Sequence, residues 1–249
     1  MGQRVTALPF FITNKEKCMF NDFEEKYSPK TLNDIVFHSI NAKQTVEDIV
    51  SGLMGFPTGG INGILLYGVN GTGKTALAKI LPDLIEEARG GSSPYVAYYK
   101  IAQGGDNGAG VIDSIKSQAQ LIPLMGTYHY FILDEVDNLR AESMSSLKVA
   151  MNTNTNQCVY IFTTNRLGLI ENGVQDRCER VEFNAAADAE WLPVVKRILA
   201  DYNVTGVTDG DILKIISHCN GSARRILNAA RKLVVQQYRA NGRELKLAA

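Results

Sequence analysis

Short apolar runs alternate with amphipathic segments over the first three quarters of the chain. The runs with the length of buried strands are "GILLYG" at 63–68, "YVAYYKIA" at 95–102, "YHYFILDE" at 128–135, "CVYIFTTN" at 158–165 and "CERVEF" at 178–183. Helical spacing is found between them in "KTALAKILPDLIEEA" at 74–88, "GVIDSIKSQAQLI" at 110–122 and "SSLKVAMNTN" at 145–154. Because parallel strands need crossover connections, this alternation predicts an α/β core with a five-stranded parallel sheet covered by helices on both faces.

The pattern changes after Phe183. Apolar residues then recur at helical spacing in three segments, 186–204, 208–221 and 222–241, with no strand-like run between them. Thr208 followed by Asp211 is typical of a helix N-cap, and Gly221 suits a turn between helices. We therefore predict an N-terminal extension over 1–22, an α/β core over 23–184 and a small all-α lid domain over 185–249.

Composition limits the possible partners and the cellular compartment of the protein. Hydrophobic residues make up 45% of the chain and charged residues 21%, and the formal net charge is zero, so any nucleic acid must bind to a local surface. No apolar run approaches the length that spans a bilayer, and we identify no signal peptide. The four cysteines lack metal-ligand spacing and predict reduced thiols. We expect a cytoplasmic, soluble, intracellular protein that does not bind membranes.

The stretch from Gly68 to Thr75 matches G-x-x-x-x-G-K-[ST] and lies between a predicted strand and a predicted helix. Glycines let the backbone close around phosphate oxygens, and the helix offers its positive end to the same anion. Lys74 would reach the β and γ phosphates, and the Thr75 hydroxyl would bind Mg²⁺. A chance glycine-rich turn is the alternative, which this context disfavours. The predicted nucleotide-binding residues here are Gly68, Asn70, Gly71, Thr72, Gly73, Lys74, Thr75 and Ala76.

Two acids follow the strand in "HYFILDEVD" at 129–137. Ligands of open α/β sheets bind at the carboxyl ends of the strands, which is where this strand delivers Asp134 and Glu135. We predict that Asp134 holds Mg²⁺ and that Glu135 activates the attacking water. The acids could instead cap a helix, but the phosphate loop upstream favours an enzyme that hydrolyses ATP. The expected cofactors are therefore ATP and Mg²⁺. Asn165, at the end of another strand, could orient the water, although strand ends often carry such residues.

Several stretches, in order, are similar to one known family. They are "FEEKYSPKTLNDIV" at 23–36, "GVNGTGKTALA" at 68–78, "FILDEVDNL" at 131–139, "TTN" at 163–165, "VQDRCERVEF" at 174–183 and "GSARRILN" at 221–228. Together they resemble the AAA+ ATPases and, among these, the clamp-loader group of replication factor C small subunits and their phage counterparts. The resemblance covers residues 23–235 approximately and implies a P-loop core followed by a helical lid. It also makes a phage or a prokaryote one option for the source.

The resemblance also implies roles for individual residues. Asn165 would be the polar residue of sensor 1. Arg177 would be an arginine finger that reaches the ATP of a neighbouring subunit, and Arg224 would contact the phosphates of its own subunit. For Arg180 and Arg225 an ordinary surface charge is the better interpretation. The residues that would border the adenine, with plain core packing as an equal alternative, are Tyr27, Ile35 and Val36.

The chain also departs from the family pattern. Ser28 stands where the family has the arginine of Y-R-P, and Asp176 replaces the serine of S-R-C. Clamp loaders continue beyond the lid into a helical collar that holds their pentamer together. We expect no collar here, so either a collar was lost or removed, or the subunits assemble through their ATPase domains alone.

The stretch "AQGGDNGAGVIDSIK" at 102–116 bears on the substrate. Protein-threading relatives carry an aromatic residue there, and this stretch has none. It resembles the clamp-loader helix whose N-terminus faces DNA phosphates, with Gly110 and Lys116 as candidate contacts. A flexible surface loop is the alternative.

We therefore expect a ring or spiral of this chain or of paralogous subunits that acts on DNA in replication or repair. A sliding clamp is one further partner to consider. The alternative function is remodelling or regulation of a protein assembly without DNA, or a nucleotide-dependent scaffold.

Overall fold

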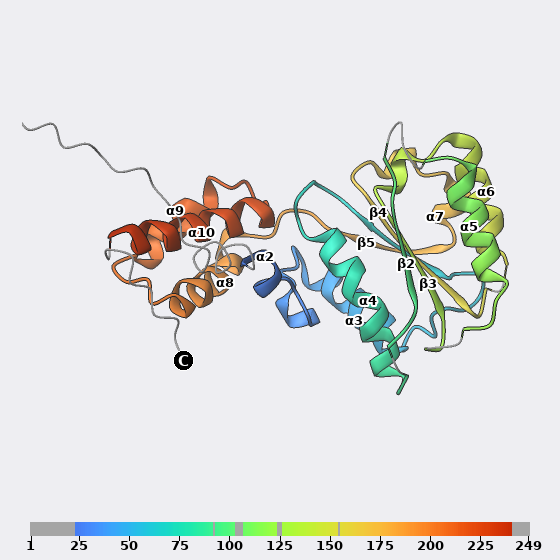
Figure 1. The fold of residues 1–249 in the computed structure, drawn as a ribbon, viewed down its shortest axis with the longest axis horizontal. Coiled ribbons are helices and arrows are strands. Elements are labelled where there is room, and N and C mark those ends of the chain that lie inside the picture. The colour runs from blue at the N-terminus through green and yellow to red at the C-terminus, as the bar shows by residue number, and fades with distance from the viewer. Residues whose placement is uncertain (1–22, 92, 103–106, 124–125, 154, 241–249) are drawn as a thin grey trace, which may run out of the picture.

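The computed structural model describes residues 23–91, 93–102, 107–123, 126–153 and 155–240. Its centre is a parallel five-stranded sheet in the order β2-β3-β4-β1-β5. The strands are β1 (Gly63–Tyr67), β2 (Val96–Lys100), β3 (His129–Asp134), β4 (Cys158–Thr164) and β5 (Cys178–Glu182). Each lies within one of the five runs that the apolar pattern predicted. All carboxyl ends meet at one edge of the sheet, as parallel strands require (Figure 1).

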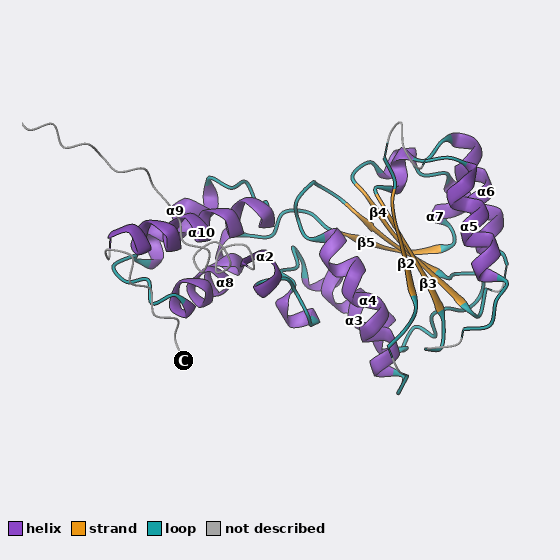
Figure 2. Ribbon diagram, in the orientation of Figure 1, coloured by secondary structure: helices purple, strands orange, loops and turns teal. Residues whose placement is uncertain are grey.

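Alternate residues of the strands supply two separate apolar clusters, so the core domain has three layers (Figure 2). One face, with Ile64, Leu66 and Ile132 among its residues, is covered by α3 (Ile40–Ser51) and α4 (Lys74–Ala88). The other face is covered by α5 (Ala109–Ala119), α6 (Ala141–Met151) and the short α7 (Asn172–Gln175). Burial on both faces explains why the inner strands β1, β3 and β4 are largely apolar, whereas the edge strands β2 and β5 have exposed positions.

Helix ends differ in part from the prediction. α4 begins and ends where the pattern placed it, whereas α5 stops at Ala119 and leaves Leu121 and Ile122 60% and 77% exposed. α6 begins four residues before the predicted Ser145 and ends before Asn152. Apolar residues at the end of a helical pattern predict that the helix continues. The side chains of Leu121 and Ile122, however, do not pack into the core.

The second domain consists of helices α8 (Asp188–Asp201), α9 (Asp209–Ser217) and α10 (Ala223–Ala240) around one apolar cluster. The predicted N-cap is confirmed, because Thr208 Oγ1 accepts the Asp211 N–H at 3.2 Å and the Asp211 carboxylate accepts the Thr208 N–H at 3.3 Å. This reciprocal pair satisfies two amides at the start of α9. No helix in the described part of the chain is long and apolar enough to cross a membrane.

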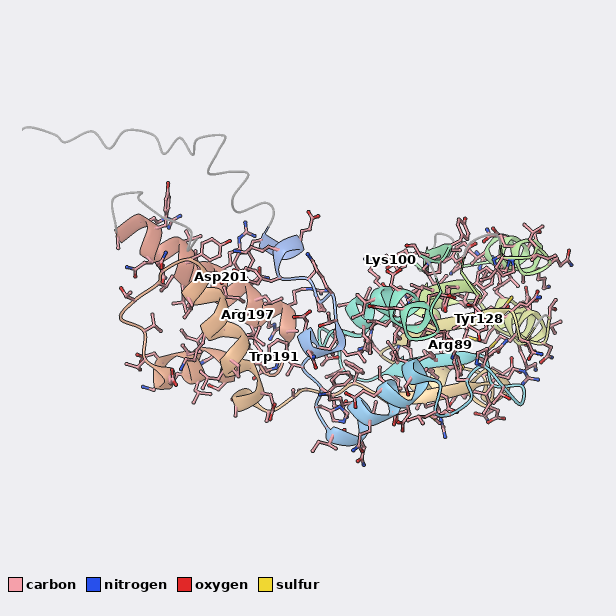
Figure 3. All side chains as sticks on the ribbon, turned by 90° about the horizontal axis from the view of Figure 1, so that it is seen from below. Arg89, Lys100, Tyr128, Trp191, Arg197 and Asp201 are labelled. Carbon is pink, nitrogen blue, oxygen red and sulfur yellow. The ribbon has the colours of Figure 1, made fainter. Side chains whose placement is uncertain are left out.

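The first part of the segment before α3, with Phe23 and Tyr27, packs against the helical domain rather than the sheet. The short helix α2 (Phe23–Lys26) lies beside α8, and the Phe23 ring stacks on Tyr202 with centroids 6.1 Å apart (Figure 1). The Tyr27 hydroxyl donates to Asp201 at 2.7 Å, and Arg197 pairs with Asp34 at 3.4 Å. Figure 3 shows Arg197 and Asp201 along α8. The helical domain is therefore completed by residues that we had assigned to the core.

After α2 the chain passes through a short 3₁₀ helix, Leu32–Asp34, and returns to the sheet at α3. Ile35 already belongs to the cluster under α3 and α4. Two stretches of chain thus connect the domains, one over residues 27–39 and one over residues 183–187. A further 3₁₀ helix, Val136–Asn138, follows β3, and another, Leu167–Leu169, follows β4.

Candidate active site

The loop between β1 and α4 has the backbone that its glycines predict. Gly68, Gly71 and Gly73 have φ values of 138°, 80° and 107°, where side chains with a Cβ are strained. A Cβ on Gly68 would stand 2.3 Å from the Phe183 carbonyl oxygen, so the interdomain connection lies directly on the loop. The Thr72 hydroxyl donates to the same carbonyl at 3.0 Å. The phosphate loop is therefore joined to the chain that leads into the helical domain.

Lys74 begins α4 and is 6% exposed. Its ammonium donates to the carbonyl oxygens of Gly68 and Val69 at 3.0 Å and 2.6 Å, which places the charge beside the loop. Burial lowers the pKa of Lys74 to about 8, and the charges of Asp134 and Asp137 oppose this decrease. A cation with little access to water attracts an anion strongly. The first turn of α4 carries Thr75 and the half-buried Ala76 beside it.

Asp134, the last residue of β3, is buried and accepts three side-chain hydroxyls. Its Oδ1 accepts Thr75 at 2.7 Å and Thr163 at 2.6 Å, and its Oδ2 accepts Tyr98 at 2.9 Å. A hydroxyl and a carboxylate in contact at the phosphate loop fit Mg²⁺, which takes few protein oxygens and completes its shell with water and phosphate. The predicted magnesium pair, Thr75 and Asp134, is thus brought together.

Tyr98 is a member of this site that sequence reasoning missed. It lies on β2, two residues before Lys100, the register partner of Asp134. Only the strand order reveals that β2 is the neighbour of β3. Burial raises the pKa of the Tyr98 hydroxyl, which therefore stays protonated and donates to Asp134. The Lys79 ammonium lies 5.1 Å from the centre of its ring.

Glu135 has a left-handed backbone, with φ 58° and ψ 46°. Such a conformation costs a residue with a side chain about 1–3 kcal/mol and persists where neighbouring contacts impose it. Its N–H donates to Thr163 Oγ1 at 3.0 Å, and its Oε2 accepts the Asn138 amide at 3.2 Å. The strand therefore ends in a turn that separates the Glu135 carboxylate from the buried Asp134 and leaves it half-buried at the same edge of the sheet.

Asn165 follows the last residue of β4 and is exposed at the same edge. Its neighbour Thr164 is paired with Tyr67, and the Gly68 N–H donates to the Thr164 carbonyl at 3.3 Å. The end of β4 is thus joined to the first glycine of the phosphate loop. The structure places Asn165 next to the loop.

Arg177 lies at the other edge of the sheet. Its carbonyl oxygen accepts the N–H groups of Asn62 and Gly63, at the start of β1, whereas the phosphate loop follows the end of that strand. β1 has five residues, and a rise of about 3.3 Å per residue puts roughly 16 Å between the two positions. The guanidinium donates to Asn152 Oδ1 at 2.8 Å and to the Gly173 carbonyl at 2.6 Å. The sheet therefore separates Arg177 from the phosphate loop of its own chain.

Arg224 is the second residue of α10 and is exposed. The start of α10 lies against the phosphate loop, because a Cβ on Gly71 would stand 2.6 Å from the Ser222 hydroxyl. A Cβ on Gly221 would stand 2.2 Å from the Cβ of Ala185, in the interdomain connection. Asn70, which is exposed, directly precedes Gly71 in the loop. The beginning of α10, the connection and the loop therefore form one contact region.

The three predicted adenine contacts lie at the junction of the domains but not in one cluster. The Tyr27 ring packs in the helical domain, and burial together with the Asp201 hydrogen bond raises the pKa of its hydroxyl. Ile35 belongs to the cluster under α3 and α4, and Val36 packs half-buried against the helical domain. Contact with the base stays a prediction for all three.

The predicted nucleic-acid residues lie on α5. Gly110 is exposed in the first turn of the helix, and Lys116 is half-buried further along. α5 packs against α6 on the sheet face opposite α4. Residues 103–106 of the preceding stretch lie outside the described residues. DNA contact at α5 stays a prediction.

The comparisons agree with this arrangement. Residues 64–185 match the family described as "ATPase family associated with various cellular activities (AAA)". This segment of the chain is therefore similar to AAA-family ATPase domains, and the chain has the P-loop α/β fold of that family.

More particularly, the chain is similar to replication factor C subunits. It is 26% identical to the small subunit of Haloarcula marismortui and 27% identical to subunit 5 of Mus musculus, over 82% of this chain in each case. It spans 59% and 58% of those proteins. RuvB of Thermotoga maritima has the same fold, with a TM-score of 0.66 at 16% identity over 86% of this chain and 72% of RuvB.

Proposed function

We propose that the chain is a subunit of an oligomeric AAA+ ATPase that couples ATP binding and hydrolysis to loading or remodelling on DNA, in the manner of a clamp loader. The observation that carries the proposal is the division of the catalytic set over two edges of one sheet. Lys74, Asp134 and Glu135 lie at the carboxyl edge, and Arg177 lies at the amino edge. One copy supplies the phosphate site, and the next supplies the arginine.

The residues at the carboxyl edge have separate tasks. The amides of residues 68–75 and the ammonium of Lys74 bind the phosphates. Thr75 and Asp134 would hold Mg²⁺, which neutralises charge that develops on the phosphate oxygens. Glu135 accepts a proton from the attacking water, and Asn165 orients that water. Arg224 approaches the phosphates from the start of α10, so the position of the helical lid follows the nucleotide.

Arg177 completes the site of a neighbouring copy. Its carbonyl is fixed at the start of β1, so the residue lies at the edge of the sheet that lacks a phosphate loop, and its guanidinium would leave Asn152 and Gly173 to reach a neighbour. A head-to-tail contact between copies gives rings or spirals. An arginine that stabilises the transferred phosphoryl group raises kcat by about 10³-fold or more.

Two inactive variants test this division. Lys74→Ala removes the phosphate ligand, and Arg177→Ala removes the arginine while leaving the loop intact. Each alone should lose activity, and an equimolar mixture should recover about a quarter of the wild-type rate, because random neighbours pair an intact loop with an intact arginine at that frequency. No recovery in mixtures that co-assemble by native mass would refute the shared site.

The action on DNA rests on the similarity to replication factor C and on the helix start at Gly110. ATPase rates with and without primer–template DNA are the direct test, at several salt concentrations because phosphate contacts weaken with salt. Lys116→Ala should reduce the stimulation by DNA and leave the basal rate unchanged. An ATPase that ignores DNA but responds to a protein partner would indicate the alternative, a remodeller of a protein assembly.

A further inference from the structure

A polar connection leads from the Glu135 carboxylate to an arginine on the neighbouring strand end. Asn138 donates its amide to Glu135 Oε2 at 3.2 Å and to the Ile101 carbonyl at 3.2 Å. The amide oxygen of Asn138 accepts Arg166 at 3.1 Å. With acceptors on its nitrogen and a cation on its oxygen, the amide can take only one orientation. Arg166 therefore contacts the group that holds Glu135.

Arg166 is itself anchored by a buried carboxylate. Its Nε donates to Asp137 Oδ2 at 2.8 Å, and the Asp137 side chain is 3% exposed. Thr164 donates its hydroxyl to the other oxygen of Asp137 at 2.8 Å and accepts the Arg166 N–H at 2.9 Å. The guanidinium thus uses two different nitrogens, one for Asp137 and one for Asn138. Arginine presents these two nitrogens in one rigid plane, whereas the donors of lysine all leave a single nitrogen.

We propose that Arg166 is a positioning residue for ATP hydrolysis, which acts on Glu135 through Asn138. The proposal rests on the proposed role of Glu135 as the base. Asn138 occupies Oε2 of the carboxylate, which leaves Oε1 to accept the proton of the attacking water. Arg166 opposes rotation of the Asn138 side chain, and its charge polarises the amide that donates to Glu135. The angle of the carboxylate therefore depends on an arginine that touches neither nucleotide nor water.

The competing explanation is that Arg166 only neutralises the buried Asp137. The two explanations differ in what lysine can replace. Arg166→Lys keeps a positive charge for Asp137, but its donors all leave one nitrogen and do not reproduce the planar pair of bonds to Asp137 and Asn138. If the ion pair alone matters, lysine restores full activity. If the fork matters, lysine restores the fold but not the rate.

The experiment compares kcat and KM for ATP in Arg166→Lys, Arg166→Ala, Asn138→Ala and the double variant Arg166→Ala/Asn138→Ala. Arg180→Lys, on an exposed side chain of β5, is the matched control and should behave as the wild type. Loss of one hydrogen bond corresponds to a decrease in kcat of about three- to tenfold. We expect this decrease in Arg166→Lys and in Asn138→Ala, with KM within about twofold of the wild-type value.

The double variant decides whether the two residues act in one path. Because Arg166 acts through Asn138, the double variant should be no slower than Asn138→Ala alone. Multiplication of the two effects, full rescue by lysine, or a faster Asn138→Ala enzyme would each overturn the proposal. The melting temperature is recorded for every variant, and Arg166→Lys carries the conclusion if Arg166→Ala is not folded.

Glu135→Gln separates this inference from the proposed function. If Glu135→Gln binds ATP but does not hydrolyse it, Glu135 is the base, and unchanged kcat in the Arg166 and Asn138 variants then refutes the positioning role alone. If Glu135→Gln hydrolyses ATP at the normal rate, the proposed role of Glu135 fails first, and the positioning role fails with it. All rates are measured at protein concentrations where native mass has reached its plateau.

Discussion

We predict that the buried ammonium of Lys74 makes nucleotide affinity depend on pH above neutrality. Burial lowers its pKa from the ordinary 10.5 to about 8 in the protein without nucleotide. Bound phosphates favour the charged form and raise this pKa again. Nucleotide binding therefore takes up a proton above about pH 8, and affinity falls as pH rises. With a pKa of about 8, the charged fraction, and hence the association constant, decreases about tenfold between pH 7 and pH 9.

Calorimetric titration with ATP at pH 7, 8 and 9 measures this decrease directly. Repeating it at pH 8 in buffers of different ionisation enthalpy gives the proton uptake, about half a proton per nucleotide. Lys74→Arg is the control, because arginine stays charged over this range and its affinity should be independent of pH. Constant affinity in the wild type, or an equal decrease in Lys74→Arg, would refute the reasoning.

The same pKa has the opposite effect on the stability of the protein without nucleotide. Between about pH 8 and pH 10.5 the unfolded chain keeps the Lys74 proton while the folded chain has lost it. The unfolded state then binds more protons, so the contribution of Lys74 to the free energy of unfolding increases with pH in this window. The difference in melting temperature between the wild type and Lys74→Met should therefore change in favour of the wild type from pH 8 to pH 10.

Two further predictions concern single hydroxyls. Thr208→Ala removes the cap of α9 and should lower the free energy of unfolding, measured by urea denaturation, by about 1 kcal/mol. Adding Asp211→Ala to this variant should cost little more, because the capping pair is already broken. Tyr98→Phe removes a donor to Asp134 and should raise the Mg²⁺ concentration for half-maximal ATPase activity about tenfold. ATP binding in the absence of Mg²⁺ should be unchanged, and an unaltered Mg²⁺ requirement would contradict the assigned contact.

The parts of the fold that the sequence predicted are those whose evidence is local. The loop before α4 needs glycine at three positive-φ positions, and the apolar periodicity of the following residues gives both ends of the helix. The three inner strands, β1, β3 and β4, were recognisable because each is buried on both faces and is therefore largely apolar. The pairing of Thr75 with Asp134 followed from the rule that strand ends of a parallel sheet meet at one edge.

The features that were missed depend on the order of strands and on packing between distant segments. Tyr98 contacts Asp134 only because β2 is the neighbour of β3. From the sequence, Arg166 is an ordinary arginine in a loop. Its contact with Asn138 depends on the pairing of β3 with β4. The segment at Phe23 carries no sign that its ring packs on Tyr202, 179 positions later, because aromatic residues suit either domain equally.

The position of α2 has a mechanical consequence. The helical lid is joined to the sheet by two separate stretches of chain, and the second of them also rests on the phosphate loop through Phe183. A body attached at one point can swivel in any direction, whereas attachment along two lines leaves rotation about a single axis. We therefore predict that motion of the helical domain carries Arg224 toward and away from the loop on one arc. Residues 27–39, the first of the two stretches, would then set the direction of this motion.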